Sequence, residues 1–198
     1  MLKKMDRKNI FLTVYKNRFL FLICMMLILG TFFGTCVLKI IPENIAENLF
    51  RFITKSSLDF KGILINSFSF PFIVLIGIYL SGTGILGSFT VPAILFVNGF
   101  FFGFENALNY KFSGMNYIIN SVIAFFTLVV FLNFMIIILS ENSIYCSKQL
   151  TDYINGKNTE KSHYNTKKIT VKFIIFTVIF AVISLISSCF YKFIQQIL

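Results

Sequence analysis

The sequence predicts an all-α integral membrane protein, a bundle of about five transmembrane helices with one short external amphipathic helix. Two observations lead to this fold class. Only 13% of the 198 residues are charged and 57% are hydrophobic, whereas a soluble domain carries about 25% charged residues. The apolar residues also form long runs that contain no Asp, Glu, Lys, Arg or His. The surface of this protein must therefore face lipid.

Five apolar runs are long enough to cross a bilayer as helices. A hydrocarbon core of about 30 Å needs about 20 residues at a rise of about 1.5 Å per residue. A charge at the centre of such a helix would cost about 2.5–3.5 kcal/mol, so an uncharged run is a strong signal. The predicted spans are residues 19–38, 62–80, 85–104, 117–139 and 173–191. They make residues 1–198 a single polytopic membrane domain.

The basic residues predict the orientation of these spans. Five spans place the N-terminal tail and the loop before the last span on the same side, and these segments hold 12 of the 18 basic residues. The positive-inside rule assigns that side to the cytoplasm, so we expect a cytoplasmic N-terminus and an external C-terminus in the cell membrane. The net charge of +10 is explained by this orientation signal and by attraction to anionic lipid headgroups. We expect no nucleic-acid partner, because the basic residues flank spans and do not gather on a folded domain.

Residues 41–55 predict the external amphipathic helix. Apolar residues recur at i, i+4, i+7 and i+8, as Ile45, Leu49, Phe52 and Ile53. Charged residues occupy the opposite face, which is the pattern of a helix lying at an interface. The apolar face either contacts the outer leaflet or a partner, or packs on the protein's own bundle. The sequence leaves both interpretations open.

Small residues recur at a spacing of four in the first three predicted spans. The pairs are Gly30 with Gly34, Gly77 with Ser81, and Gly99 with Gly103. Such pairs let helix backbones approach closely, because lipid supplies no hydrophobic drive between helices. The first and third spans run in the same direction, so we expect their glycines to pack these helices together. A contact between two copies of the chain is the alternative.

Amides within the spans offer a second hypothesis for function. Asn66 and Asn98 need hydrogen-bond partners in hydrocarbon, so they should face the bundle interior or a partner protein. They serve either as ordinary contacts between helices or as a broken-helix ligand site of the kind found in transporters. Coupled transport usually needs ionisable groups at membrane depth, and the predicted spans hold none. A channel or a substrate-binding subunit is therefore the alternative function.

The ionisable residues predict no enzyme. His163 lies in the predicted cytoplasmic loop, and Asp59 and Asp152 lie outside the spans on opposite sides. These residues cannot form the pairs or triads that nucleophilic or metal-dependent catalysis requires. Four cysteines without a C-x-x-C pair, and one histidine, supply no zinc ligand set. We expect no cofactor, no metal and no small-molecule substrate.

Residues 64–103 resemble the stage II sporulation protein M family of endospore-forming bacteria. The matching residues are Leu64-Ile65-Asn66-Ser67, Gly77-Ile78-Tyr79, Gly82, Gly87 and Asn98-Gly99-Phe100-Phe101-Phe102-Gly103. The chain length, the basic N-terminal tail and the five predicted spans also fit this family. The family's Asn-Gly signature falls on Asn98, Gly99 and Gly103.

This resemblance implies a role in engulfment during sporulation. The family's members lie in the mother-cell membrane at the septum, where they anchor two peptidoglycan-degrading proteins, stage II sporulation proteins D and P. They act as scaffolds without catalysis of their own. The resemblance therefore implies a scaffold that recruits cell-wall hydrolases. The expected contact surfaces are the predicted helix in residues 41–55 and the external connection in residues 105–116.

Overall fold

The computed structural model describes residues 18–56, 60–124, 126–156 and 166–197. These residues form six α-helices and no strand, which confirms the all-helical class. The helices are α2 (Arg18–Val37), α3 (Glu43–Ser56), α4 (Phe60–Thr83), α5 (Gly87–Ala124), α6 (Phe126–Ile154) and α7 (Thr166–Ile197).

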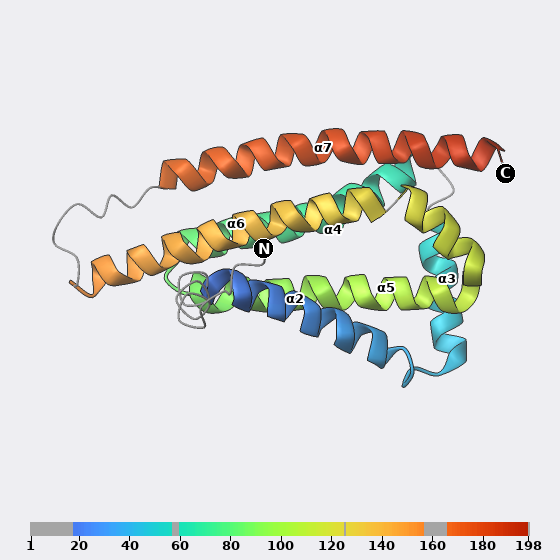
Figure 1. Ribbon diagram of the computed structural model, residues 1–198, viewed down its shortest axis with the longest axis horizontal. Helices are drawn as coiled ribbons and strands as arrows, with labels where there is room; N and C mark the ends of the chain where they lie inside the picture. The colour runs from blue at the N-terminus through green and yellow to red at the C-terminus, as the bar shows by residue number, and fades with distance from the viewer. Residues whose placement is uncertain (1–17, 57–59, 125, 157–165, 198) are drawn as a thin grey trace, which may run out of the picture.

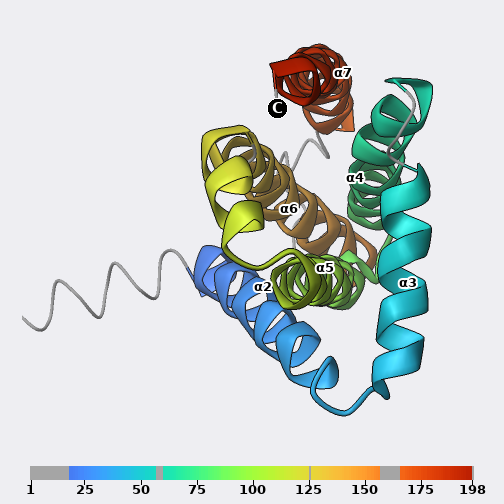
Figure 2. The ribbon, with the colours of Figure 1, turned by 90° about the vertical axis from the view of Figure 1, so that its right-hand side faces the viewer.

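Five of these helices run along the long axis of the molecule, and α3 crosses one end of the bundle (Figures 1 and 2). Helix α6 contacts α2, α4, α5 and α7. The main contact of α2 is with α5, whereas α7 lies on the far side of α6, against α4 and α6. The bundle therefore has α6 near its centre and the first and last helices at its periphery.

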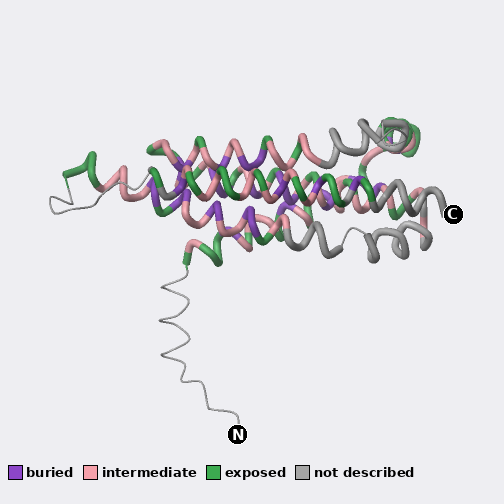
Figure 3. The backbone as a smooth tube through the Cα atoms, turned by 90° about the horizontal axis from the view of Figure 1, so that it is seen from above, coloured by how far each residue is buried: buried purple, intermediate pink, exposed green. Residues whose placement is uncertain are grey.

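Three helical segments in the described part of the chain are long and apolar enough to cross a membrane, judged by length and composition. They are Arg18–Val37, Gly87–Phe112 and Ile169–Ile186. Large apolar side chains point outward from them, among them Ile28 and Phe32 of α2, and exposed residues recur along the helices in Figure 3. An outward-facing apolar surface of this kind is suited to lipid and not to water.

Two apolar clusters form the interior. The larger joins α2, α4, α5, α6 and α7 and contains Ile78, Leu95 and Phe180, each almost fully buried. The Phe68 ring stacks on those of Phe72 and Phe180, with centroids 5.0 Å and 5.3 Å apart. The smaller cluster packs α3 against α5 and is described below. Because offset aromatic stacking adds to simple contact, these rings help to hold α7 on α4.

The predicted span 117–139 does not form one straight helix. Gly114 leaves the helical conformation, with φ 57° and ψ −140°, and the chain then turns away from the axis of α5 (Figure 1). The predicted span lies after this turn and is divided between the end of α5 at Ala124 and the start of α6 at Phe126. Residues 105–116, expected as an external connection, are instead part of α5. The apolar run 117–139 could not predict this turn. Gly114 lies three residues before the run begins, and hydropathy carries no information on backbone angles.

We expect Gly114→Ala to destabilise the turn within α5. A Cβ at this position would meet no atom within 4 Å, so the cost comes from the backbone angles alone, about 1–3 kcal/mol. Thermal unfolding of the purified protein in detergent, followed by circular dichroism, would measure it. Gly84→Ala is the control, because its Cβ would meet nothing closer than 3.6 Å. Equal unfolding temperatures for the two variants would contradict the prediction.

Candidate functional site

The predicted glycine pairs meet at the contact of α2 with α5. A Cβ built on Gly30 would lie 2.1 Å from the Phe96 carbonyl oxygen, and one on Gly34 would lie 2.1 Å from the Phe100 carbonyl oxygen. Both distances are far below any real Cβ contact. Glycine is therefore the only residue that this separation of the two backbones accommodates.

The contact is reciprocal. A Cβ on Gly99 would lie 2.3 Å from the Leu27 carbonyl oxygen, and one on Gly103 would lie 2.2 Å from the Thr31 carbonyl oxygen. Residue numbers rise together on the two helices, so α2 and α5 run parallel. Glycines of each helix thus face backbone carbonyls of the other, an arrangement that favours dispersion and weak Cα–H···O contacts in membranes. We name these four glycines the glycine contact.

The other predicted packing residues are not members of the glycine contact. A Cβ on Gly77 would approach the Ile94 Cδ1 atom at 3.3 Å, which is the end of a flexible side chain. Asn98 is 6% exposed, one residue before Gly99. Asn66 lies within α4, but its side chain is outside the described residues. The structure therefore joins the predicted glycines of α2 and α5.

A second small-residue contact joins the α4–α5 turn to α6. A Cβ on Gly82 would lie 2.6 Å from Ser143 Cβ, and one on Gly87 would lie 2.7 Å from Ser147 Cβ. Ser147 Oγ also donates a hydrogen bond to the Ile85 carbonyl oxygen at 3.1 Å. Sequence reasoning did not assign this contact, although serines at 140, 143 and 147 repeat at helical spacing.

Helix α3 is held across the end of the bundle by α5. Ala46 is fully buried against Leu108 in the smaller apolar cluster. The Phe50 ring stacks on the Phe112 ring with centroids 5.1 Å apart. Lys111 Nζ of α5 lies 3.7 Å from Glu43 Oε1 at the start of α3. These contacts fix the position of α3 independently of its predicted apolar face.

The predicted apolar residues of α3 point away from this seat. Ile45, Leu49 and Phe52 are 49%, 37% and 74% exposed; the side chain of Ile53 lies outside the described residues. The Glu47–Arg51 ion pair, at 2.6 Å, occupies the charged face. The apolar arc is thus divided: Ala46 and Phe50 contact α5, while the other three residues form an exposed apolar edge. We name Ile45, Leu49 and Phe52 the α3 edge.

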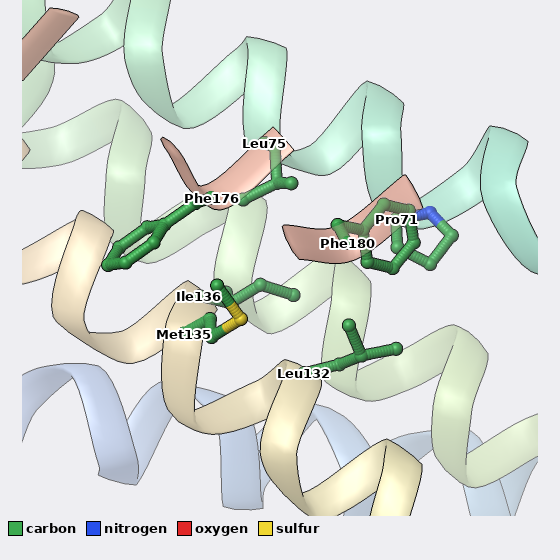
Figure 4. A pocket seen from close by; sticks show the side chains of 7 residues that line it. All are labelled: Pro71, Leu75, Leu132, Met135, Ile136, Phe176 and Phe180. Atoms are coloured by element: carbon green, nitrogen blue, oxygen red, sulfur yellow. The ribbon is translucent and has the colours of Figure 1, made fainter. Parts of the chain in front are cut away.

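A small hollow lies among α4, α6 and α7 and is lined wholly by apolar side chains (Figure 4). They are Pro71, Leu75, Leu132, Met135, Ile136, Phe176 and Phe180. Its cavity volume of about 10 Å³ is close to the least that can hold one water molecule, so it has no room for a ligand. Within the described residues, no three His, Cys, Asp or Glu side chains gather as a metal site would require.

Comparison of the chain with protein-family models, with curated proteins and with solved structures gave no match in any of the three. The function proposed below is therefore inferred from the residues of this chain and from the sequence resemblance described above.

We expect Gly34→Ala to weaken the packing of α2 on α5. The added Cβ would meet a backbone carbonyl, which cannot rotate away, so the helices must separate at a cost of about 1–3 kcal/mol. Thermal unfolding in detergent would measure the loss. Gly77→Ala is the matched control, since the Ile94 side-chain end can move aside. A variant at Gly34 as stable as the one at Gly77 would remove the glycine contact from the packing.

Proposed function

We propose that the protein is a membrane scaffold that holds wall-facing partner proteins at the external end of its bundle, without catalysis of its own. The α3 edge carries this proposal. It consists of apolar side chains on a helix that other residues, Ala46 and Phe50, already hold against α5. The side chains of the α3 edge are therefore not needed to pack the helix. Exposed apolar residues on a fixed element are typical of an interaction surface.

The membrane arrangement in this proposal has five crossing helices. Helices α4 and α6 have 24 and 29 residues, and about 20 residues of helix suffice to cross the core. They lie beside the three candidate spans within the same bundle. Helix α3 crosses the bundle end opposite the start of α2 (Figure 1), where the positive-inside rule places the exterior. The N-terminus is then cytoplasmic and the C-terminus external.

The chemical class of partner follows from the resemblance to the stage II sporulation protein M family. It implies that the partners are peptidoglycan-degrading enzymes, stage II sporulation proteins D and P, held at the mother-cell septal membrane during engulfment. The glycine contact includes Gly99 and Gly103 of the family signature. In this proposal the signature therefore serves to build a stiff helix pair beneath the partner surface.

A small transport component is the alternative function. It needs a polar path or cavity at membrane depth, and Asn98 is a buried amide that could line one. The hollow described above is instead lined by apolar side chains, and the closest helix contacts bring backbone against backbone. These observations favour the scaffold.

The scaffold proposal predicts that Leu49→Glu with Phe52→Glu abolishes recovery of the hydrolase partners in pull-downs from sporulating cells. Two carboxylates on the α3 edge would leave charges buried in an apolar contact, which costs several kcal/mol. The control, Asn44→Glu with Asn48→Glu, adds the same two charges to exposed polar positions of α3 and should keep recovery. Unchanged recovery with the edge variant would remove this surface from the interface.

The five-span arrangement predicts that reporter fusions at residues 1 and 198 report opposite compartments. A phosphatase fused at the C-terminus should be active, and one fused at the N-terminus should be inactive, because this reporter folds only outside the cytoplasm. Cysteine labelling in intact cells would check the same point at α3. Equal activity of the two fusions would contradict an odd number of spans.

A further inference from the structure

We propose that three exposed apolar side chains at the α4–α5 turn, Ile85, Leu86 and Phe89, insert into the cytoplasmic leaflet of the membrane. The turn then lies among lipid and not in the cytoplasm. We name these three residues the turn anchor. The inference is independent of the scaffold proposal, because the turn lies at the end of the bundle opposite α3 (Figure 1). Only the naming of the leaflet rests on the five-span arrangement.

The hairpin of α4 and α5 carries no charge through its turn. Residues 62–104 contain no Asp, Glu, Lys, Arg or His, so the turn lacks the basic residues that hold cytoplasmic loops in place. The connection reads Ser81-Gly82-Thr83-Gly84-Ile85-Leu86 and ends in two large aliphatic residues. A turn that projects into water is normally polar. The composition of this turn instead suits contact with lipid.

The side chains of the turn anchor point outward. Ile85, Leu86 and Phe89 are 50%, 67% and 79% exposed. Phe89 also begins a row of exposed residues along α5 at a spacing of four. The row comprises Phe89, Ala93, Val97 and Phe101. It belongs to the candidate span Gly87–Phe112, which starts at the turn itself, so the turn anchor is continuous with a surface suited to lipid.

Carbonyl groups of the turn find hydrogen-bond donors within the protein. Ser147 Oγ of α6 donates a hydrogen bond to the Ile85 carbonyl oxygen at 3.1 Å. Thr83 Oγ1 donates one to the Leu80 carbonyl oxygen at 2.8 Å. Irregular backbone at membrane depth is tolerated only where the protein supplies such partners, because lipid supplies none. The turn therefore meets the condition for lying among lipid.

The neighbouring residues of α6 indicate the depth of the turn. Ser147 and Thr151 are the residues of α6 whose hydroxyls reach the Ile85 carbonyl oxygen, Thr151 Oγ1 at 3.4 Å. The residues that follow them in α6, Lys148 and Asp152, are charged. Charges at this level place the turn at the boundary between headgroups and acyl chains. At this boundary apolar side chains insert by about 5–10 Å.

Lipid is the occupant that covers the whole of this surface. A cytoplasmic protein would cover only its tip at Ile85 and Leu86, whereas acyl chains cover the tip and the exposed row along α5 together. A protein partner is therefore the alternative that the experiment below must separate from lipid.

Tryptophan fluorescence of the full chain tests this inference, because the chain contains no tryptophan of its own. The variants are Phe89→Trp at the turn, Phe32→Trp on the outward side of α2, and Tyr153→Trp near the end of α6, which projects beyond the turn (Figure 1). The three native side chains are aromatic and 79%, 63% and 64% exposed, so the changes are matched. Each variant is reconstituted in vesicles of phosphatidylcholine and phosphatidylglycerol. The quenchers are a phospholipid with brominated acyl chains and acrylamide dissolved in the water.

We expect brominated lipid to quench Phe89→Trp about as strongly as Phe32→Trp and several-fold more strongly than Tyr153→Trp, with the reverse order for acrylamide. Acrylamide quenching of Phe89→Trp equal to that of Tyr153→Trp would place the turn in water and overturn the proposal. Protection of Phe89→Trp from both quenchers would indicate a protein contact and would also overturn it. Lipid quenching of Tyr153→Trp equal to that of Phe89→Trp would show that the whole end of the bundle lies in the interface, and would overturn the assignment to the turn.

The measurement does not depend on the scaffold proposal or on the orientation of the bundle. The quenchers report depth from the nearer membrane surface, whichever side that surface faces. Loss of partner recovery in the α3 edge variant and lipid quenching at Phe89 are therefore separate results, and either can fail without the other.

Discussion

The close approach of two backbones at the glycine contact is the constraint on which the rest of this structure depends. Lipid solvates apolar side chains as well as other helices do, so helices in a bilayer are held together by contact distance and backbone polarity. Four glycines let α2 and α5 reach a separation that any Cβ would prevent. Helix α5 then carries the seat of α3, through Leu108 and Phe112, and also contacts α4 and α6.

The second small-residue contact fixes the start of α5. There the α4–α5 turn is held on α6 by Gly82, Gly87 and the serines that face them. The two contacts together fix α5 at its start and in its interior, at Gly99 and Gly103, relative to its neighbours. A helix held in this way is a stable base for α3, which rests on it through a ring stack and a small buried alanine. The proposed scaffold function needs such a base, since a partner bound to α3 would pull on it.

Periodicity in the sequence predicted where helices form better than it predicted which face of each helix is buried. Periodicity predicted a helix in residues 41–55, and α3 covers Glu43–Ser56. It also predicted the glycine pairs of α2 and α5, which lie against each other's backbones. The division of the apolar arc of α3 could not be predicted, because Ala46 is too small to mark a buried face in a hydrophobicity pattern. The contact of Gly82 with Ser143 joins residues 61 positions apart and leaves no local signal. The turn at Gly114 depends on backbone angles, which a run of apolar residues does not reveal.

By itself, the sequence determined that this chain is helical and suited to a membrane, because charge content and the length of apolar runs are set by composition alone. It also determined where backbones can approach, since only glycine lacks a Cβ. The tertiary structure decided which helix receives each glycine, which half of α3 is covered, and which side chains of α6 hold the α4–α5 turn. These outcomes depend on distances between helices far apart in the chain, and no pattern within a single helix encodes them.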